Sequence, residues 1–227
     1  MDLMRIVDTE SGVRFSVLRS LSQTEHLDFL AAVKTIEDFD FSHSYLNNAS
    51  TNLAEFHDQV HIEAQRHLGS SLAEYHPPSY RAELNRRLMN VLMAFNLVET
   101  YLCNVTKKLY GEASSEFTRL RKLQNDAYDT QFAYRFAYLL RNYIAHRGYP
   151  ITRFGYSASA DAVSVEVAIN TAHLLSGSFP WKRVKRDLLE RREVEVGPVL
   201  DEAFQVHVQA CQVPGGLDFP PHVASWH

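Results

Sequence analysis

Cysteines and long apolar runs are both scarce in this sequence. Cys103 and Cys211 are the two cysteines among 227 residues. Thiols so far apart form neither a disulfide framework nor a metal-binding spacing, so the composition suits a reducing compartment. The opening residues, MDLMRIVDTESG, lack the apolar run of a signal peptide, and no window approaches a transmembrane span. The sequence therefore predicts a soluble, cytoplasmic protein that does not enter a membrane.

An excess of positive charge is also missing. The formal net charge is −4 and the sequence pI is about 6.2. Such a protein does not bind nucleic acid by bulk electrostatics, so any contact with nucleic acid requires a local basic patch. The sequence shows no internal repeat, no glycine-rich phosphate loop and no nucleophile elbow.

Apolar residues at helical spacing dominate what is present. The chain is 45% hydrophobic, which is enough for one domain over residues 1–213, followed by a loose or extended tail over 214–227. The three- and four-residue steps predict helices. We expect a first helix capped by Thr24, with Leu27, Leu30, Val33 and Ile36 on one stripe. Another is capped by Ser114 or Ser115, and a short one begins near Trp181. The remaining helices are expected over residues 44–68, 79–110, 131–147 and 198–212.

Two stretches alternate with a period of two and predict β-hairpins, near residues 3–20 and 151–170. The turns are expected at residues 9–12 and 157–161. The predicted fold class is therefore mainly α, an antiparallel helical bundle with small β-hairpin additions. The helix over 79–110 carries a heptad seam from Leu84 to Leu109, which packs either within the bundle or between the subunits of a dimer.

The helix over residues 131–147 separates into two arcs when projected at about 100° per residue. One arc is apolar. The other gathers cations, an amide, an imidazole and phenols on a face expected to be open, namely Arg141, Asn142, His146, Arg135, Tyr134 and Tyr138. Asn142 and His146 are i, i+4 neighbours, and Arg141 is long enough to reach what His146 touches. A phosphodiester would suit this group.

Residues Arg141 to His146 read RNYIAH, that is, an arginine, an asparagine, three further residues and a histidine. The helix is expected to end directly after them, at Arg147-Gly148-Tyr149-Pro150. In this motif the chain resembles the HEPN superfamily. The resemblance implies an all-helical domain. Many members are metal-independent ribonucleases of toxin–antitoxin, abortive-infection and other defence systems, so it also implies RNA as a partner and no cofactor or metal.

The resemblance also implies roles for these residues. RNA carries its own nucleophile, the 2′-hydroxyl, so His146 would act as general base or acid and Arg141 would stabilise the transition state. Asn142 would orient His146 or contact the phosphate. The expected product ends are a 2′,3′-cyclic phosphate and a 5′-hydroxyl. In the family the motif commonly lies at a homodimer interface, so we expect a homodimer.

An antitoxin or regulatory protein would be a further partner. In HEPN toxins that a nucleotidyltransferase antitoxin controls, the modified tyrosine lies two residues after the histidine. That position is Gly148 here, and Tyr149 follows it. This departure puts that partner and that form of control in doubt.

Basic residues elsewhere supply candidate contacts to RNA phosphates. Arg119, Arg121 and Lys122 lie on the helix that precedes the motif helix, and we group them with Arg135, Tyr138 and Tyr149 as RNA-binding candidates. Four cations also fall within residues 182–186. They either hold phosphates or form a solvated helix face balanced by nearby acids such as Asp187.

Two other interpretations of the sequence stay open. The first is a non-catalytic helical module that uses the same polar face to bind a nucleotide or a partner protein. The second is a metal-dependent hydrolase around His57 and His61, which are spaced i, i+4 and can chelate a metal. No third ligand is evident, and surface histidines beside a core stripe explain the pair more simply, so we predict no metal site.

Overall fold

The structure is a computed structural model that describes residues 2–9, 12–68, 78–158 and 163–212. The described chain is mainly helical, as predicted, with one two-stranded and one three-stranded antiparallel sheet. It divides into two compact units, Met1–Phe41 and Ser42–His227, where the sequence predicted a single domain. The tail predicted over 214–227 lies outside the described residues.

The first unit begins with the predicted hairpin. Strands β1 (Asp2–Thr9) and β2 (Gly12–Ser20) pair antiparallel, and helix α1 (Gln23–Leu68) follows. The predicted cap, Thr24, is wrong by two residues, because Ser22 caps the helix and forms a capping box with Glu25. The Glu25 amide donates to the Ser22 hydroxyl at 3.2 Å, and the Ser22 amide donates to the Glu25 carboxylate at 3.0 Å.

Helix α1 is continuous, where the sequence predicted one helix from Thr24 and another over residues 44–68. Residues 13–68 contain neither glycine nor proline, so nothing in the sequence breaks the helix before residue 68. The start of the predicted stripe is exposed, with Leu27 at 58% and Leu30 at 47%. A lone hairpin offers too little surface to cover it.

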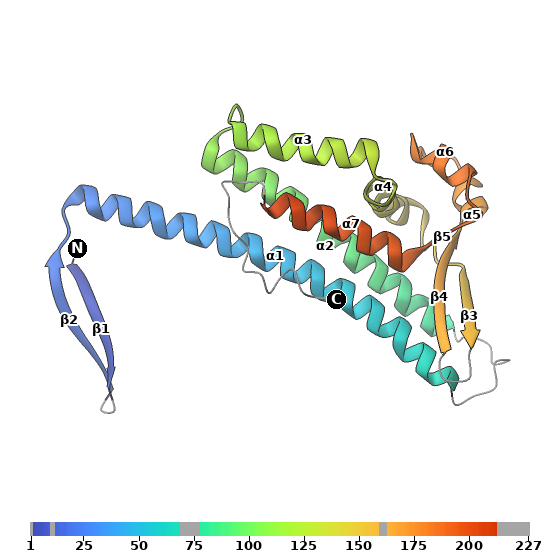
Figure 1. The fold of residues 1–227 in the computed structure, drawn as a ribbon, viewed down its shortest axis with the longest axis horizontal. Helices are drawn as coiled ribbons and strands as arrows, with labels where there is room; N and C mark the ends of the chain where they lie inside the picture. Colours follow the sequence, from blue (N-terminus) through green and yellow to red (C-terminus); the bar gives the residue numbers. More distant parts are fainter. Residues whose placement is uncertain (1, 10–11, 69–77, 159–162, 213–227) are drawn as a thin grey trace. The chain divides into compact units, whose positions relative to one another are not determined.

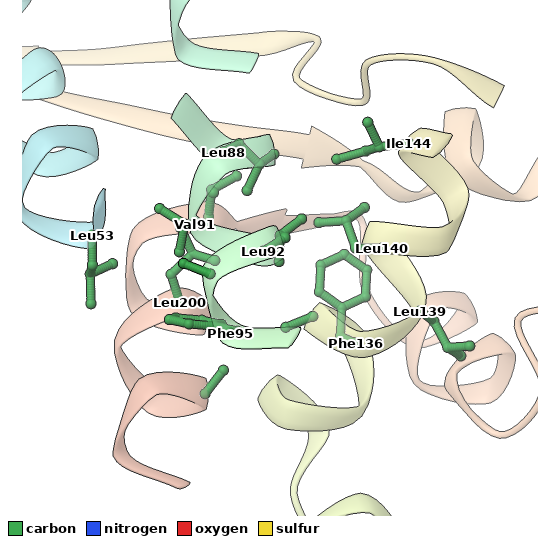
Figure 2. Close-up of a cluster of buried hydrophobic side chains, with 14 of the residues drawn as sticks. Leu53, Leu88, Val91, Leu92, Phe95, Phe136, Leu139, Leu140, Ile144 and Leu200 are labelled. Carbon is green, nitrogen blue, oxygen red and sulfur yellow. The ribbon is translucent and has the colours of Figure 1, made fainter. Parts of the chain in front are cut away.

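The second unit is built around α2 (Pro78–Tyr110), which contacts α3 (Ser115–Thr130), α4 (Phe132–Arg147) and α7 (Val196–Gln212) (Figure 1). The heptad seam of α2 is buried from Leu84 through Val105, and only Leu109 is exposed. Figure 2 shows seam residues such as Leu88, Val91 and Phe95 in one buried cluster, which also contains Leu53 of α1, Phe136 of α4 and Leu200 of α7. The seam therefore packs within the chain and is not available as a dimer contact.

Helix α2 also corrects the expectation that no window approaches a transmembrane span. Among the described residues, Ser79–Tyr110 is the one helix long and apolar enough, by length and composition, to cross a membrane. The core helix of a globular unit passes the same test. Burial of the seam against three other helices accounts for its apolar character.

The connection between α3 and α4 is a single residue, Gln131, with extended backbone at φ −103° and ψ 117°. An antiparallel return needs a loop of about 2–5 residues. Figure 1 accordingly draws α4 nearly end-on while α3 lies along the plane of the view. The helices form a bundle, as predicted, but α4 crosses α3 instead of returning antiparallel to it.

Beyond α4, strands β3 (Arg153–Ala158) and β4 (Val163–Asn170) form the predicted second hairpin, and residues 159–162 of its turn lie outside the described residues. A third strand, β5 (Glu193–Glu195), pairs with β4 and was not predicted, because three residues are too few to show alternation. Two short helices, α5 (Thr171–Leu175) and α6 (Val184–Leu189), lie between β4 and β5.

Trp181 anchors the segment between α5 and α6 to α4. Its side chain is 2% exposed, and its indole N–H donates to the carbonyl of Leu174 at 3.0 Å. The ring stacks on Phe136 and Tyr143 of α4, with centroid distances of 6.0 and 5.2 Å. A buried indole with its N–H satisfied contributes both apolar area and orientation.

We therefore expect Trp181→Ala to lower the free energy of unfolding by about 3–5 kcal/mol, because it removes the largest fully buried ring and leaves a cavity. Leu189→Ala, close by on α6 but 67% exposed, should change it by less than about 0.5 kcal/mol. Urea unfolding followed by circular dichroism measures both. Equal costs for the two variants would contradict the anchoring role of Trp181.

Candidate functional site

The motif helix α4 ends directly after the motif. Gly148 has φ +101°, and its amide donates to the carbonyl of Ile144 at 3.2 Å. Such a conformation favours glycine and stops the helix. His146 is therefore in the last turn of α4, where it is exposed, and Tyr149 beyond the stop is 58% exposed.

Arg141 and Asn142 are in direct contact. The Arg141 Nη2 donates to the Asn142 Oδ1 at 2.8 Å, and its Nε donates to the same oxygen at 3.2 Å. The Arg141 guanidinium also lies over the ring of Tyr138, 5.4 Å from the centroid. Both residues of the pair are half-buried. The guanidinium is thus held in one orientation, with donors that can still reach an anion.

His146 is one helical turn beyond Asn142, the spacing at which helical side chains are neighbours. The structure gives its ring no hydrogen bond to another described residue. Of the three predicted catalytic residues, the structure joins Arg141 with Asn142 and leaves His146 at the solvent-exposed end of the same helix.

Two residues expected on the open face of α4 are buried. Tyr134 is 4% exposed and packs against His207 of α7, at 5.5 Å between ring centroids. Arg135 is 7% exposed, and its Nη1 donates to the carbonyls of Tyr128 and Asp129 at 2.7 and 3.0 Å. Its Nη2 forms an ion pair with Asp187 of α6 at 2.9 Å.

The prediction that Arg135 contacts RNA is therefore corrected. Its guanidinium binds carbonyls in the last turn of α3 and neutralises a carboxylate, so its donors serve the fold. The helical projection could not show this, because α3, α6 and α7 cover parts of α4 that the polar arc indicated would face solvent.

Glu99 of α2 is a residue that the sequence reasoning missed. Its pKa is raised, chiefly by burial, while a hydrogen bond from Tyr134 and the charges of Arg121 and Arg141 act to lower it. Burial and the nearby Glu99 carboxylate in turn raise the pKa of Tyr134. The available signal was a lone carboxylate in the middle of an apolar helix. Glu99 thus places a partly buried carboxyl group within the electrostatic influence of Arg121 and Arg141.

A small cavity beside Arg141 and a larger cleft share three lining residues, Glu99, Tyr134 and Tyr138. The small cavity, about 20 Å³, has room for one water. The cleft measures about 430 Å³. Besides the shared residues, its lining comprises three cations, two amides and a further tyrosine: Arg121, Lys182, Arg183, Gln124, Asn125 and Tyr128.

Some of the other predicted RNA-binding residues line the cleft and others do not. Arg121 and Tyr138 line the cleft. Arg119 and Lys122 lie on the same helix as Arg121 but do not line it, and Lys122 pairs with Asp126 at 2.5 Å. Tyr149 does not line it either. Of the cations in residues 182–186, Lys182 and Arg183 line the cleft, whereas Lys185 and Arg186 do not.

The His57 and His61 pair has protein partners. The His57 imidazole contacts Asp201 of α7 at 2.8 Å, and the His61 imidazole contacts Gln65 at 2.9 Å. The hydrogen bond with Asp201 raises the pKa of His57. Within the described residues, no group of three or more histidine, cysteine or acidic side chains is arranged to hold a metal ion.

Comparison with known proteins gives no relative: no family model, no curated protein and no solved structure matches this chain. The arrangement on α4 and along the cleft must therefore be interpreted from its own chemistry.

His207, which lines the small cavity, allows a test of the geometry around Tyr134. Its ring lies 4.8 Å from that of Phe95, and burial lowers its pKa to about 4. The imidazole is therefore neutral in the fold but protonated in the unfolded chain below its ordinary pKa of about 6.5. Its contribution to stability is complete above pH 6.5 and is lost as the pH falls towards 4.

We expect wild type to lose about 3 kcal/mol more stability than His207→Leu between pH 7.5 and pH 4, because the leucine takes up no proton. Urea unfolding of both proteins at several pH values measures this difference. Parallel pH dependences would show that His207 is not buried between Phe95 and Tyr134.

Proposed function

We propose that the protein is a metal-independent endoribonuclease whose reaction site is formed by Arg141, Asn142 and His146. The observation that carries the proposal is the arginine held by Asn142 and by the Tyr138 ring. An exposed histidine lies one turn beyond Asn142, and Tyr138 also lines a cleft that carries further cations. The resemblance of RNYIAH to the HEPN motif supports the same chemistry.

The reaction needs no nucleophile from the protein. The 2′-oxygen of the RNA attacks the adjacent phosphorus as its proton passes to a base, and the bond from phosphorus to the 5′-oxygen breaks as that oxygen gains a proton. The products are a 2′,3′-cyclic phosphate and a 5′-hydroxyl. Histidine suits either proton transfer at neutral pH, which gives His146 its role as general base or acid.

Arg141 neutralises the charge that develops on the phosphate oxygens. The Arg141 side chain donates to Asn142 through Nε and Nη2. Its Nη1 donates no hydrogen bond to another described residue, so N–H donors remain for an anion. A guanidinium oriented before the reaction stabilises developing charge without reorganising. Asn142 then positions Arg141, and as the i, i+4 neighbour of His146 it links the two catalytic groups.

One histidine cannot act as acid and base at the same moment. We propose a homodimer in which two copies of the motif share one cleft, so that the partner subunit supplies the second proton-transfer group. The exposed end of α4, with His146 and Tyr149, is available for that contact, whereas the seam of α2 is buried within the chain. A cytoplasmic toxin or defence effector, controlled by an antitoxin or regulatory protein, fits such an activity.

Binding without catalysis is the second candidate function. It is favoured by a specific observation: His146 lies outside both the cleft and the small cavity, while the cations Arg121, Lys182 and Arg183 line the cleft. A histidine in the last turn of a helix also interacts favourably with the helix dipole and needs no catalytic role. In this case the protein binds a nucleotide or a partner protein.

Cleavage of labelled total RNA in EDTA distinguishes the two functions. We expect wild type to leave cyclic-phosphate ends, and Arg141→Ala and His146→Ala each to lower the rate by about 100-fold or more, because each removes a group used in the transition state. Arg86→Ala and His173→Ala are matched controls, since both residues are exposed and lie on other helices.

A loss of activity in EDTA would contradict the metal-independent mechanism. A folded, dimeric wild type that binds RNA without cleaving it would favour the binding module. Cleavage that survives both alanine substitutions would mean that other residues perform the reaction.

A further inference from the structure

We propose that the cleft between α3 and the segment at Lys182 and Arg183 binds unpaired RNA, with its cations on successive phosphates and its tyrosines against a base. This inference rests on the proposed function and names the form of RNA that the protein recognises. It uses residues outside the RNYIAH motif, all of which line one cleft.

The cations that line the cleft come from two different parts of the chain. Arg121 comes from α3, where its Nη1 donates to Gln124 at 2.9 Å, and the side chains of both residues line the cleft. Lys182 and Arg183 come from the segment that Trp181 anchors. Because the two groups lie on different elements, an extended backbone can contact both while it passes between them.

The backbone at Lys182 adds an independent observation. Its φ is +49°, and among the described residues no other non-glycine residue has a positive φ. A lysine in this conformation is strained, and strained residues concentrate at functional positions. Lys182 directly follows the buried Trp181 and lines the cleft. A glycine would adopt this φ with less strain, so a lysine at this position costs stability.

The Arg183 guanidinium is paired with the Asp129 carboxylate, but both side chains are more than half exposed, at 68% and 56%. Exposed ion pairs contribute little to stability. A phosphate can therefore replace Asp129 with little loss. With a net charge of −4, binding depends on the local excess of charge in the cleft, whose lining holds three cations and one carboxyl group, that of Glu99.

The aromatic residues select unpaired RNA. Tyr128 and Tyr138 both line the cleft and meet edge to face, with 5.8 Å between centroids and 89° between planes. A base can lie against such rings only when it is free of its own helix, because a duplex stacks its bases inside. The cleft volume of about 430 Å³ is within the range of small-ligand pockets and suits a short piece of one strand.

A binding titration with a fluorescently labelled ten-nucleotide oligouridine tests this proposal. The parent protein is His146→Ala, which prevents cleavage. We expect Lys182→Gly to weaken binding about tenfold and to lower the slope of log affinity against log salt by about 0.7, the value for one phosphate contact on a single strand. Because glycine relaxes the backbone at φ +49°, this variant should fold at least as well as the parent.

The matched control is Lys185→Ala, which removes an exposed lysine three residues along the chain, on α6, that does not line the cleft. Alanine is used here because a glycine would destabilise the helix. It should change the affinity less than twofold. A duplex of the same length should bind the parent at least tenfold more weakly than the single strand.

Equal weakening by Lys182→Gly and Lys185→Ala, or equal affinity for the duplex, would overturn the proposal, as would a parent that fails to bind oligouridine. The two proposals fail separately. Cleft-dependent binding without cleavage by wild type would overturn the ribonuclease alone. Cleavage by wild type with unaltered binding in Lys182→Gly would overturn the cleft alone.

Discussion

The guanidinium of Arg135 is the charge on which the geometry of the second unit depends. It is buried between the last turn of α3, whose carbonyls accept two of its hydrogen bonds, and Asp187 of α6. A buried charge without partners is costly, so α3, α4 and α6 must keep these relative positions. That arrangement sets the corner at Gln131, and with it the cleft between α3 and the segment before α6.

The apolar packing of α4 determines which of its side chains remain accessible to solvent. Phe136 and Leu140 face α2, while Figure 2 places Leu139 on the side turned away from Leu92. With Trp181 and His207 packed against further parts of the helix, little of α4 is left to solvent. What remains accessible is the strip through Tyr138, Arg141 and Asn142, and then the helix end with His146. Accessible polar groups on an otherwise buried helix are the expected form of a site built on a rigid element.

Periodicity predicted most of the helices and both hairpins, because amphipathic patterns and turn residues are local properties, but it divided α1 into two helices and missed the short α5. Of the two arrangements left open for the α2 seam, within the bundle or between subunits, the structure shows burial within the chain. Of the two predicted caps, Ser114 is the one whose hydroxyl accepts from the Phe117 amide. The predictions that failed are those that depend on tertiary contacts. A polar arc cannot reveal that Arg135 and Tyr134 lie beneath other elements, and the sequence around Lys182 does not show which of its cations reach the cleft. Glu99 was missed because its partners come from α3 and α4.

In the proposed reaction, the RNA supplies its own nucleophile to a phosphate held by Arg141. The most direct measurement is single-turnover cleavage of a short oligoribonucleotide by wild type, compared with the same oligonucleotide carrying one 2′-deoxynucleotide on the 5′ side of the cleaved bond. We expect cleavage at that bond to stop. The affinity of the protein for the modified oligonucleotide should stay within about twofold of that for the unmodified one, since only one hydroxyl is lost. Cleavage that continues at the deoxy position would show that water or a protein group attacks the phosphate, and would contradict the proposed reaction.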